Sequence, residues 1–423
     1  MRYGKLEKGL YFEWEIEVNA PLSEVWDFAS NTDRLNAAIG SGTNEYTEIP
    51  NPKGGSFLYG KTVNGGIVSE FREFPYEWLE NKYVGVYREY SRGPVKKMLF
   101  DNIFTETENG FKIKFIMQFE TSSFIFNPII KFEVYKNSIP NFRETFKHLE
   151  KFAKRIESKP LPVFGFVPSS GDNQRRSELI NKFNIIKTED SIREKIAIYI
   201  LDTPDNDLLK IKPYAVAHQI CENKRRVLEF FLRATKEGFF DLNWDILCPS
   251  CRGPKSSSRH LNELEDSVHC PTCNIDYSGE FDKSVELTFV PTEKLRKVEG
   301  GIYCFGGPGR TPHIRVQWRV KGKGNEKVKY FVQKGTYRIF SLQKKEIINI
   351  ECDPNFPEVK EINYPNTEDL IRCATGEIEF NFENSDEEEC LIRIERTTWM
   401  DDIVTAYEVT AMQEFRDLFS SEV

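Results

Sequence analysis

The sequence predicts a multidomain protein of the α+β class. Its 423 residues exceed what one hydrophobic core usually holds, so we expect two to four domains. Alternating polar and apolar residues, typical of strands, occupy both ends of the chain. A helical middle part is followed by two Cys-x-x-Cys pairs. The 33 phenylalanines favour thick apolar cores or a cavity lined by rings.

Composition and turn signals divide the chain into six segments. Pro, Gly and Ser are dense in ESKPLPVFGFVPSSGDNQRR, as at a domain boundary. The expected segments are a first α+β domain at 1–157, a linker at 158–176, a helical region at 177–245, a metal-binding region at 246–283, a β domain at 284–409 and a terminal helix at 410–423.

The first segment begins with a strand, because residues 11–18 alternate as a half-buried strand does. The stretch NAPLSEVWDFASNTDRLN then predicts a helix, and several antiparallel strands follow, with a hairpin signal at TENG. Residues Tyr135–Ile156 are expected to form one long helix, which Pro140 would kink near its start. Apolar residues recur along it at helical spacing: Phe142, Phe146, Leu149 and Phe152.

This order of elements resembles the START/Bet v 1-like superfamily, also called the SRPBCC or polyketide cyclase fold. The resemblance covers about the first 157 residues and implies a helix-grip domain, in which a curved antiparallel sheet wraps the long helix around an apolar cavity. A hydrophobic small molecule or lipid would be the ligand. The implied cavity residues are Trp26, Phe142, Phe146, Leu149 and Phe152. The alternative is that these side chains fill an ordinary core.

The helical region at 177–245 is expected to contain helices at Ser191–Leu201, Lys212–Ile220 and Lys224–Glu237, with Gly238 ending the last. Two helices joined by CEN and followed by GFFDLNW look like a winged helix-turn-helix. Its lysines and arginines could touch phosphates. However, such side chains are usually only solvated, and the net charge of −8 argues against nucleic acid as the main partner.

Four cysteines of the stretch CPSCRGPKSSSRHLNELEDSVHCPTC have the spacing C-x2-C-x18-C-x2-C. Two sulfurs of one pair can reach the same ion at about 2.3 Å, and two pairs complete a tetrahedral shell. We therefore expect Cys248, Cys251, Cys270 and Cys273 to form a zinc ribbon around a structural Zn2+, with no open position for catalysis. Iron is the alternative metal for four thiolates.

The β domain is predicted to be a β-sandwich, because short strands alternate with turn signals. Its glycine-rich stretch CFGGPGRTPH lacks the ending of a P-loop and is expected to be a turn, with Arg310 and His313 as weak candidates for a small site. No catalytic constellation is evident in the sequence. The cysteines outside the two pairs, Cys304 among them, are expected to be small apolar fillers.

The two Cys-x-x-Cys pairs and the stretch that follows them up to TPH, together with the terminal TAMQEFRDLFSSEV, are similar to the N-terminal half of bacterial class III adenylate/guanylate cyclases. The resemblance implies a regulatory and sensory region in which a ligand controls a C-terminal cyclase domain, and in which a homodimer is an option because such cyclases work as dimers. We expect no cyclase activity from the printed chain, because Asp401 and Asp402 on one strand would point to opposite faces. The alternatives are a free-standing lipid or hydrophobic-ligand carrier and a winged-helix transcription regulator.

No apolar run reaches the roughly 18 residues that a membrane span needs. The N-terminus has no apolar stretch of the length of a signal peptide, and the paired cysteines suit a reducing compartment. We therefore expect a cytoplasmic protein without a membrane span.

Overall fold

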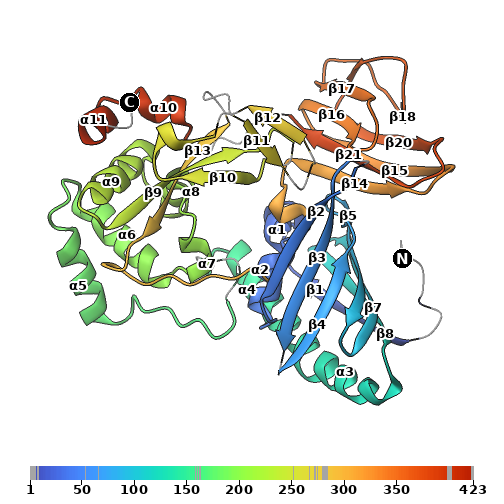
Figure 1. Ribbon diagram of the computed structural model, residues 1–423, viewed down its shortest axis with the longest axis horizontal. Coiled ribbons are helices and arrows are strands. Elements are labelled where there is room, and N and C mark those ends of the chain that lie inside the picture. The colour runs from blue at the N-terminus through green and yellow to red at the C-terminus, as the bar shows by residue number, and fades with distance from the viewer. Residues whose placement is uncertain are drawn as a thin grey trace. The chain divides into compact units, whose positions relative to one another are not determined.

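Strands from residues 1–164 and from residues 302–399 join one sheet (Figure 1). The computed structural model describes residues 6, 9–52, 54–64, 66–157, 159, 161, 163–250, 252–265, 267–270, 273, 275–278, 284–397 and 403–420. The fold is mixed α+β and has two compact units. The first contains Met1–Phe164, Pro271–Asn274 and Ile302–Trp399, and the second contains Gly165–Cys270, Ile275–Gly301 and Met400–Val423.

The large sheet of the first unit has 13 strands within the described residues. Its order is β1-β8-β7-β6-β5-β14-β21-β16-β17-β19, and β4, β3 and β2 branch from β6. The strands are β1 (Leu10–Val18), β2 (Asn44–Pro50), β3 (Ser56–Asn64), β4 (Ile67–Glu73), β5 (Glu77–Leu79), β6 (Tyr83–Arg92), β7 (Val95–Thr107), β8 (Gly110–Thr121), β14 (Ile314–Val320), β16 (Gly335–Ser341), β17 (Ile347–Cys352), β19 (Leu370–Cys373) and β21 (Cys390–Arg396).

The residue alternation in β1 explains which face of this strand is buried. Phe12 and Trp14 are buried, and the glutamates that alternate with the apolar residues lie on the other face, where Glu13 pairs with Lys114 at 2.6 Å. The opposite strand β8 places Phe115 across from Trp14, and their rings stack with centroids 5.1 Å apart. The alternation therefore fixes which side of the sheet faces the helices.

Helices cover the apolar side of this part of the sheet. They are α1 (Leu22–Ala29), α2 (Thr32–Ala38), η1 (Phe124–Phe126), α3 (Asn127–Glu133), η2 (Val134–Ser138) and α4 (Ile139–Ala153), and η4 (Pro308–Arg310) follows much later in the chain. The order of strand, helical segment, antiparallel strands and long helix is the order that the sequence predicts, but the helical segment consists of two short helices, α1 and α2, instead of one.

The predicted single helix Tyr135–Ile156 is wrong at both ends. The helical path already begins at Phe124, and Val134–Ser138 is a π-helical turn. Pro140 lies in the first turn of α4, where its missing N–H costs little. The helix ends at Ala153, because Arg155 adopts a left-handed φ of 60°.

A second sheet of the first unit shares a core with part of the large sheet. It has the order β15-β20-β18, with β15 (Gly324–Val332), β18 (Glu361–Tyr364) and β20 (Gly376–Asn384). Val328 of β15, Ile339 of β16 and Phe380 of β20 belong to one buried cluster. By contrast, β13 pairs with β9 in the second unit. The contacts thus group the chain into two compact units, each made of several chain segments. The boundaries of the six segments expected from the sequence stay predictions.

The second unit combines helices with two small sheets, β10-β9-β13 and β11-β12. Three of its helices, α6, α8 and α9, match the predicted ones to within two residues. The elements are α5 (Asn173–Phe183), α6 (Asp190–Asp202), α7 (Asp205–Leu208), α8 (Pro213–Gln219), α9 (Lys224–Lys236), β9 (Phe240–Leu247), β10 (Pro254–Ser258), η3 (Leu261–Glu263), β11 (Ser267–Cys270), β12 (Ile275–Ser278), β13 (Val285–Pro291), α10 (Ala406–Thr410) and α11 (Gln413–Leu418).

The end of the chain forms two short helices instead of the one expected. Phe415 is fully buried and meets the ring of Trp244 with centroids 5.9 Å apart. Arg233 of α9 donates to the carboxylate of Glu414 at 2.8 and 3.1 Å. The apolar stripe of the terminal segment therefore packs within the second unit.

Candidate ligand site and metal centre

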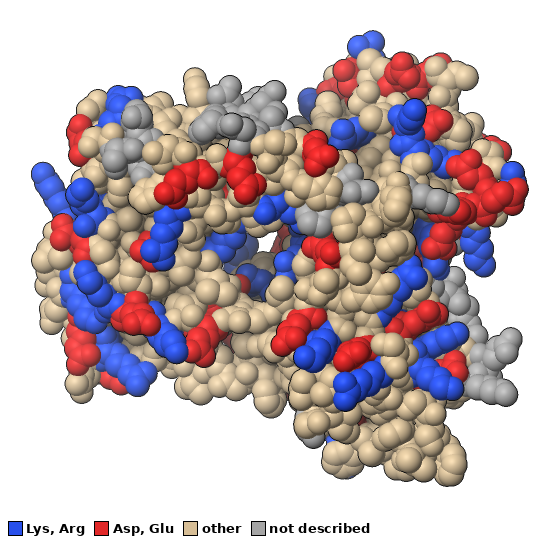
Figure 2. Space-filling model, viewed as in Figure 1, with Lys and Arg blue, Asp and Glu red and all other residues tan. Residues whose placement is uncertain are grey.

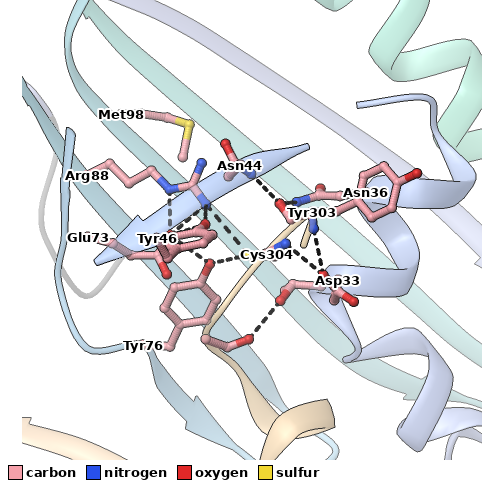
Figure 3. A network of polar contacts seen from close by, with 12 residues as sticks. Asp33, Asn36, Asn44, Tyr46, Glu73, Tyr76, Arg88, Met98, Tyr303 and Cys304 are labelled. Atoms are coloured by element: carbon pink, nitrogen blue, oxygen red, sulfur yellow. Dashed lines mark hydrogen bonds and ion pairs between the residues drawn. The ribbon is translucent and has the colours of Figure 1, made fainter. Parts of the chain in front are cut away.

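The segment 302–313, which we call the strap, crosses the first unit beside α2 and β2 (Figure 3). The backbone N–H groups of Tyr303 and Cys304 both donate to Oδ1 of Asp33 at 2.8 Å. The side-chain amide of Asn44 donates to the carbonyl of Tyr303 at 2.5 Å. Much of this stretch is thus a tethered segment rather than only a turn between strands.

Two glycines allow the strap to lie close to its neighbours. A Cβ at Gly306 would lie 2.8 Å from the ring of Tyr76, which is too close for any other residue without a shift. Gly307 has a φ of 99°, which side chains disfavour. Arg310 and His313, the weak candidates that the sequence offered for a small site, both belong to the strap. The Arg310 guanidinium is 5.2 Å from the centroid of the Phe305 ring. His313 is buried, and its backbone carbonyl accepts from the N–H of Arg396.

An ion pair lies on the inner side of the sheet next to the strap. Glu73 of β4 and Arg88 of β6 are directly opposite each other. Arg88 donates from Nε at 2.7 Å, and its Nη2 lies 2.6 Å from the same oxygen, Oε2 of Glu73. The guanidinium also lies 4.5 Å from the centroid of the Phe71 ring. Charges this deeply buried are tolerated only when they are paired, and here each has its partner.

Three neutral groups surround this pair. The Nη2 of Arg88 donates to the hydroxyl of Tyr46 at 3.2 Å and lies 3.6 Å from the sulfur of Cys304. The Tyr76 hydroxyl is 2.6 Å from that sulfur (Figure 3). Burial raises the pKa of the Cys304 thiol and the pKa of Tyr76. A thiol held in its neutral form is a poor nucleophile.

The two oxygens of the buried carboxylate differ in their partners. The Oε2 of Glu73 takes the two contacts from Arg88 and accepts from Tyr46 and Tyr76 at 3.4 and 3.3 Å. Among the residues that the structure describes, Oε1 of Glu73 is buried and has no hydrogen-bond partner. An unsatisfied buried acceptor costs about 1–3 kcal/mol, so this oxygen is a place for a donor from outside the chain.

Apolar side chains extend from the ion pair along the same face of the sheet. Met98 of β7 is the cross-strand neighbour of Arg88 and lies next to it (Figure 3). Met98, Phe100, Met117 and Phe119 are only partly buried, although all four pack on the inner core. The site thus has a polar end and an apolar wall that retains accessible surface.

All five residues predicted to line a cavity belong to this inner core. Trp26, Phe142, Phe146 and Leu149 are buried, and Phe152 is partly buried. The Phe142 ring packs 5.0 Å from that of Phe115. Contacts of this kind are equally typical of a filled core, so the role of the five residues as a cavity lining stays a prediction.

The polar end of the site is not among the residues predicted from the sequence. Its signal was present: in SEFREF and YVGVYREY, Glu73 and Arg88 stand at the positions where alternation expects an apolar, inward-facing residue. Cys304 also differs from the apolar filler expected of it, because its sulfur belongs to the polar network.

The second candidate site is a group of cysteines. The sulfurs of Cys248, Cys270 and Cys273 are buried and lie within 4.8 Å of one another. Around Cys248, the N–H of Ser250 donates to its sulfur at 3.4 Å, and Arg252 adopts a φ of 54°. The β11–β12 hairpin positions the other two cysteines of the group: Cys270 ends β11, and Cys273 lies in the turn.

These residues fit a zinc ion. Tetrahedral zinc with bonds of about 2.3 Å places its sulfurs about 3.8 Å apart, and the observed grouping is compatible with this. Cysteines bind zinc as thiolates, and the dication compensates their charge in a buried place. The fourth predicted ligand, Cys251, and the residues Asp401 and Asp402 lie outside the described residues.

Comparisons with known proteins cover parts of the chain. Residues 176–301 match a family of unknown function (DUF5939). No curated protein matches the chain in sequence. Among solved structures, the aromatase/cyclase Zhui of Streptomyces sp. R1128 is similar to 34% of this chain over 96% of its own, with 11% identity and a TM-score of 0.28.

Two further solved structures show the same extent of likeness. Ara h 8.0201 covers 33% of this chain and 99% of its own, with 14% identity and a TM-score of 0.25. The major latex-like protein 151 of Panax ginseng covers 32% and 96%, with 10% identity and a TM-score of 0.23.

Proposed function

We propose that the first unit binds a neutral, apolar small molecule that carries a hydroxyl group. The single observation behind this proposal is Oε1 of Glu73, a buried acceptor for which the described residues offer no donor. A ligand hydroxyl would donate to it. Because Arg88 already balances the charge of Glu73, a neutral hydroxyl suits this place better than a carboxylate, which the free oxygen of Glu73 would repel.

The apolar body of the ligand would lie along the partly buried wall. Met98 stands beside Arg88, and Phe100, Met117 and Phe119 continue the same face toward the helices. Methionine side chains adapt to ligands of irregular shape, because they are unbranched and flexible. The predicted cavity residues Phe142 and Phe146 of α4 would form the opposite side.

A matched pair of ligands tests this proposal. Calorimetric titration with decanol and with its methyl ether compares two molecules that differ in the hydroxyl donor. We expect the alcohol to bind about tenfold or more tightly, because only the alcohol satisfies the buried oxygen. In Glu73→Gln this preference should shrink, whereas Glu70→Gln, which changes an exposed carboxylate of the same strand, should preserve it.

Two results would contradict the proposal. Equal binding of the alcohol and the ether would mean that Glu73 does not receive the ligand. Absence of binding by the folded protein for both molecules would favour the alternative that the rings form a filled core.

The cysteine group is proposed to hold a structural zinc ion. Cys248, Cys270 and Cys273, together with Cys251, would then form the zinc ribbon of residues 246–283. In this proposal the region around α8 and α9 is winged-helix-like, and the two sheets that share a core around β14–β21 form a β-sandwich.

We further propose that ligand binding regulates a class III nucleotidyl cyclase domain. The support is the sequence similarity described above and the position of the strap: its Cys304 touches the polar network, and its first residue, Ile302, directly follows Gly301 of the second unit in the chain. The test is to join the chain to the catalytic domain of a class III cyclase and to measure cyclic AMP formation with and without decanol. A rate that does not depend on decanol, in a fusion that binds it, would contradict regulation but leave ligand binding intact.

A further inference from the structure

The helical segment that precedes α4 exposes large apolar side chains. Five of them lie on η1, α3 and η2, and their exposed fractions are 81% for Phe124, 60% for Ile125, 53% for Ile129, 62% for Phe132 and 59% for Tyr135. Figure 2 shows that the surface over α3 carries few charged residues. Exposed apolar patches of this kind usually mark an interaction surface.

The opposite side of the same segment is also apolar. Val134 is buried in the inner core, and Ile130 and Ile139 pack against it. Apolar side chains on a helical segment are normally covered by other apolar groups. One side of this segment is covered by the first unit, so the exposed side requires a second apolar environment.

Lysines stand beside the exposed apolar residues. Lys131 and Lys136 belong to α3 and η2 and are exposed, and Lys96 is exposed at the start of β7. The hydroxyl of Ser122, two residues before Phe124, donates to the carbonyl of Gly93 in the hairpin before β7. None of the three lysines forms an ion pair with a residue that the structure describes. Only Glu133 among residues 122–138 is acidic, although the whole chain has a net charge of −8.

An open hollow lies between this hairpin and Ser122. Its volume is about 550 Å³, and its lining includes Arg92, Lys96 and Lys97. Two of these cations have acidic neighbours, because Arg92 pairs with Glu70 and Lys97 lies between Glu89 and Glu120 in the sheet. Lys96 is thus the cation of the hollow that is best placed for an outside anion.

We propose that this face, defined by Phe124, Ile125, Ile129, Phe132, Tyr135 and the lysines Lys96, Lys131 and Lys136, docks on the surface of a lipid bilayer that contains anionic lipids. Apolar rings would enter the boundary between headgroups and acyl chains, and the lysines would meet anionic headgroups. No helix in the described part of the chain is long and apolar enough to cross a bilayer, so the segment would lie in the surface.

The charge pattern favours a lipid surface over a second copy of the chain. A two-fold interface brings the same patch of both subunits together, so the three lysines of one copy would approach those of the other. Such an arrangement repels, because residues 122–138 of each copy contribute only one acidic residue, Glu133. An anionic bilayer compensates all three lysines at once.

Cosedimentation with vesicles tests the docking face, independently of the proposed ligand. The full chain is mixed with vesicles of phosphatidylcholine and phosphatidylglycerol, or of phosphatidylcholine alone. We expect binding to the anionic vesicles that weakens with added salt. The double variant Lys131→Gln/Lys136→Gln should lose about fivefold in affinity for each lysine. The double variant Phe124→Ser/Phe132→Ser should lose roughly tenfold or more.

A matched control is Phe331→Ser, which removes an exposed phenylalanine from β15 and should bind as the wild type does. Circular dichroism verifies that each variant is folded, which is expected because the changed rings are mostly exposed. The proposal is overturned if the folded wild type does not bind anionic vesicles, or if the phenylalanine variant binds unchanged. It is also overturned if ultracentrifugation finds a dimer that this variant dissociates while vesicles leave the protein in solution.

Discussion

Arg88 directs two nitrogens at a single oxygen of Glu73, and the other oxygen of that carboxylate has no partner among the described residues. A bidentate contact would have used both oxygens. The observed contact instead leaves an acceptor for a further donor, next to the partly buried side chain of Met98. This relationship makes the inner face of the first unit a candidate binding site and not only a core.

Removing one partner of this buried pair should be much more costly than removing one partner of an exposed pair. Glu73→Leu leaves the charge of Arg88 buried and unpaired, so we expect a loss of about 3–5 kcal/mol in the free energy of unfolding, measured with urea. The control is Glu70→Leu, whose partner Arg92 is largely exposed and whose loss should be about 0–1 kcal/mol. Similar losses in both variants would show that Glu73 and Arg88 are in contact with water.

The strap should not accept a side chain at Gly306. The added Cβ of Gly306→Ala meets the ring of Tyr76, so the strap must shift, with an expected loss of about 1–3 kcal/mol. Cys304 should then react faster with a thiol reagent at neutral pH, because its burial decreases. Gly171→Ala is the control, since its Cβ would meet nothing within 4 Å. Unchanged reactivity of Cys304 would mean that the strap does not hold it in place.

One zinc ion per chain is expected in protein purified without chelator, as measured by elemental analysis. Structural zinc contributes on the order of 10 kcal/mol to folding, so Cys270→Ser should lose the ion and unfold the region around β11 and β12. Cys221→Ser changes an exposed cysteine outside the group and should retain the zinc. Absence of metal in the wild-type protein would contradict the metal centre.

The docking of α11 should weaken in acid. The hydrogen bonds from Arg233 hold the pKa of Glu414 below its usual range. A carboxylate whose pKa is lowered by folding stabilises the folded state above its unfolded pKa of about 4.3, and this contribution is lost as the pH falls through the lower folded value. The protection factors of the amides in 413–418, which are the exchange rates corrected for their intrinsic pH dependence, should therefore fall as the pH decreases below about 4.

The control for this acid effect is Glu414→Gln, which cannot titrate. Exchange in the variant should already be faster at neutral pH, and the added acid dependence should be small. An acid dependence as large as that of the wild type would show that another group controls the docking of α11.

The aromatic core of the first unit should depend strongly on Phe142. This ring is 1% exposed and contacts Trp14 and Phe115, so Phe142→Ala should cost about 3–5 kcal/mol of unfolding free energy. Phe331→Ala, at an exposed position, should cost little. A small cost at Phe142 would indicate that space beside the ring is already present, and Xe or a small apolar ligand should then bind to the unchanged protein.

Much of the local structure could be predicted from the sequence. The period-two alternation of β1 and the helical spacing of Phe142, Phe146 and Leu149 are local properties, because each residue's face follows from its position in the element. The cysteine spacing likewise predicts a metal site, since two residues between cysteines allow one ion to be shared. The α+β class and the order of elements in the first 157 residues follow from such patterns.

Only the tertiary structure decided which distant segments meet. The strap brings Cys304 to Tyr76, although 228 positions separate them, and no local pattern encodes such a contact. The same holds for the pair of Glu73 and Arg88, whose charges are stabilised only because two strands place them opposite each other on the inner face. The π-helical turn before Pro140 and the burial of Phe415 against Trp244 also depend on packing, which overrides local preference when a core must be filled.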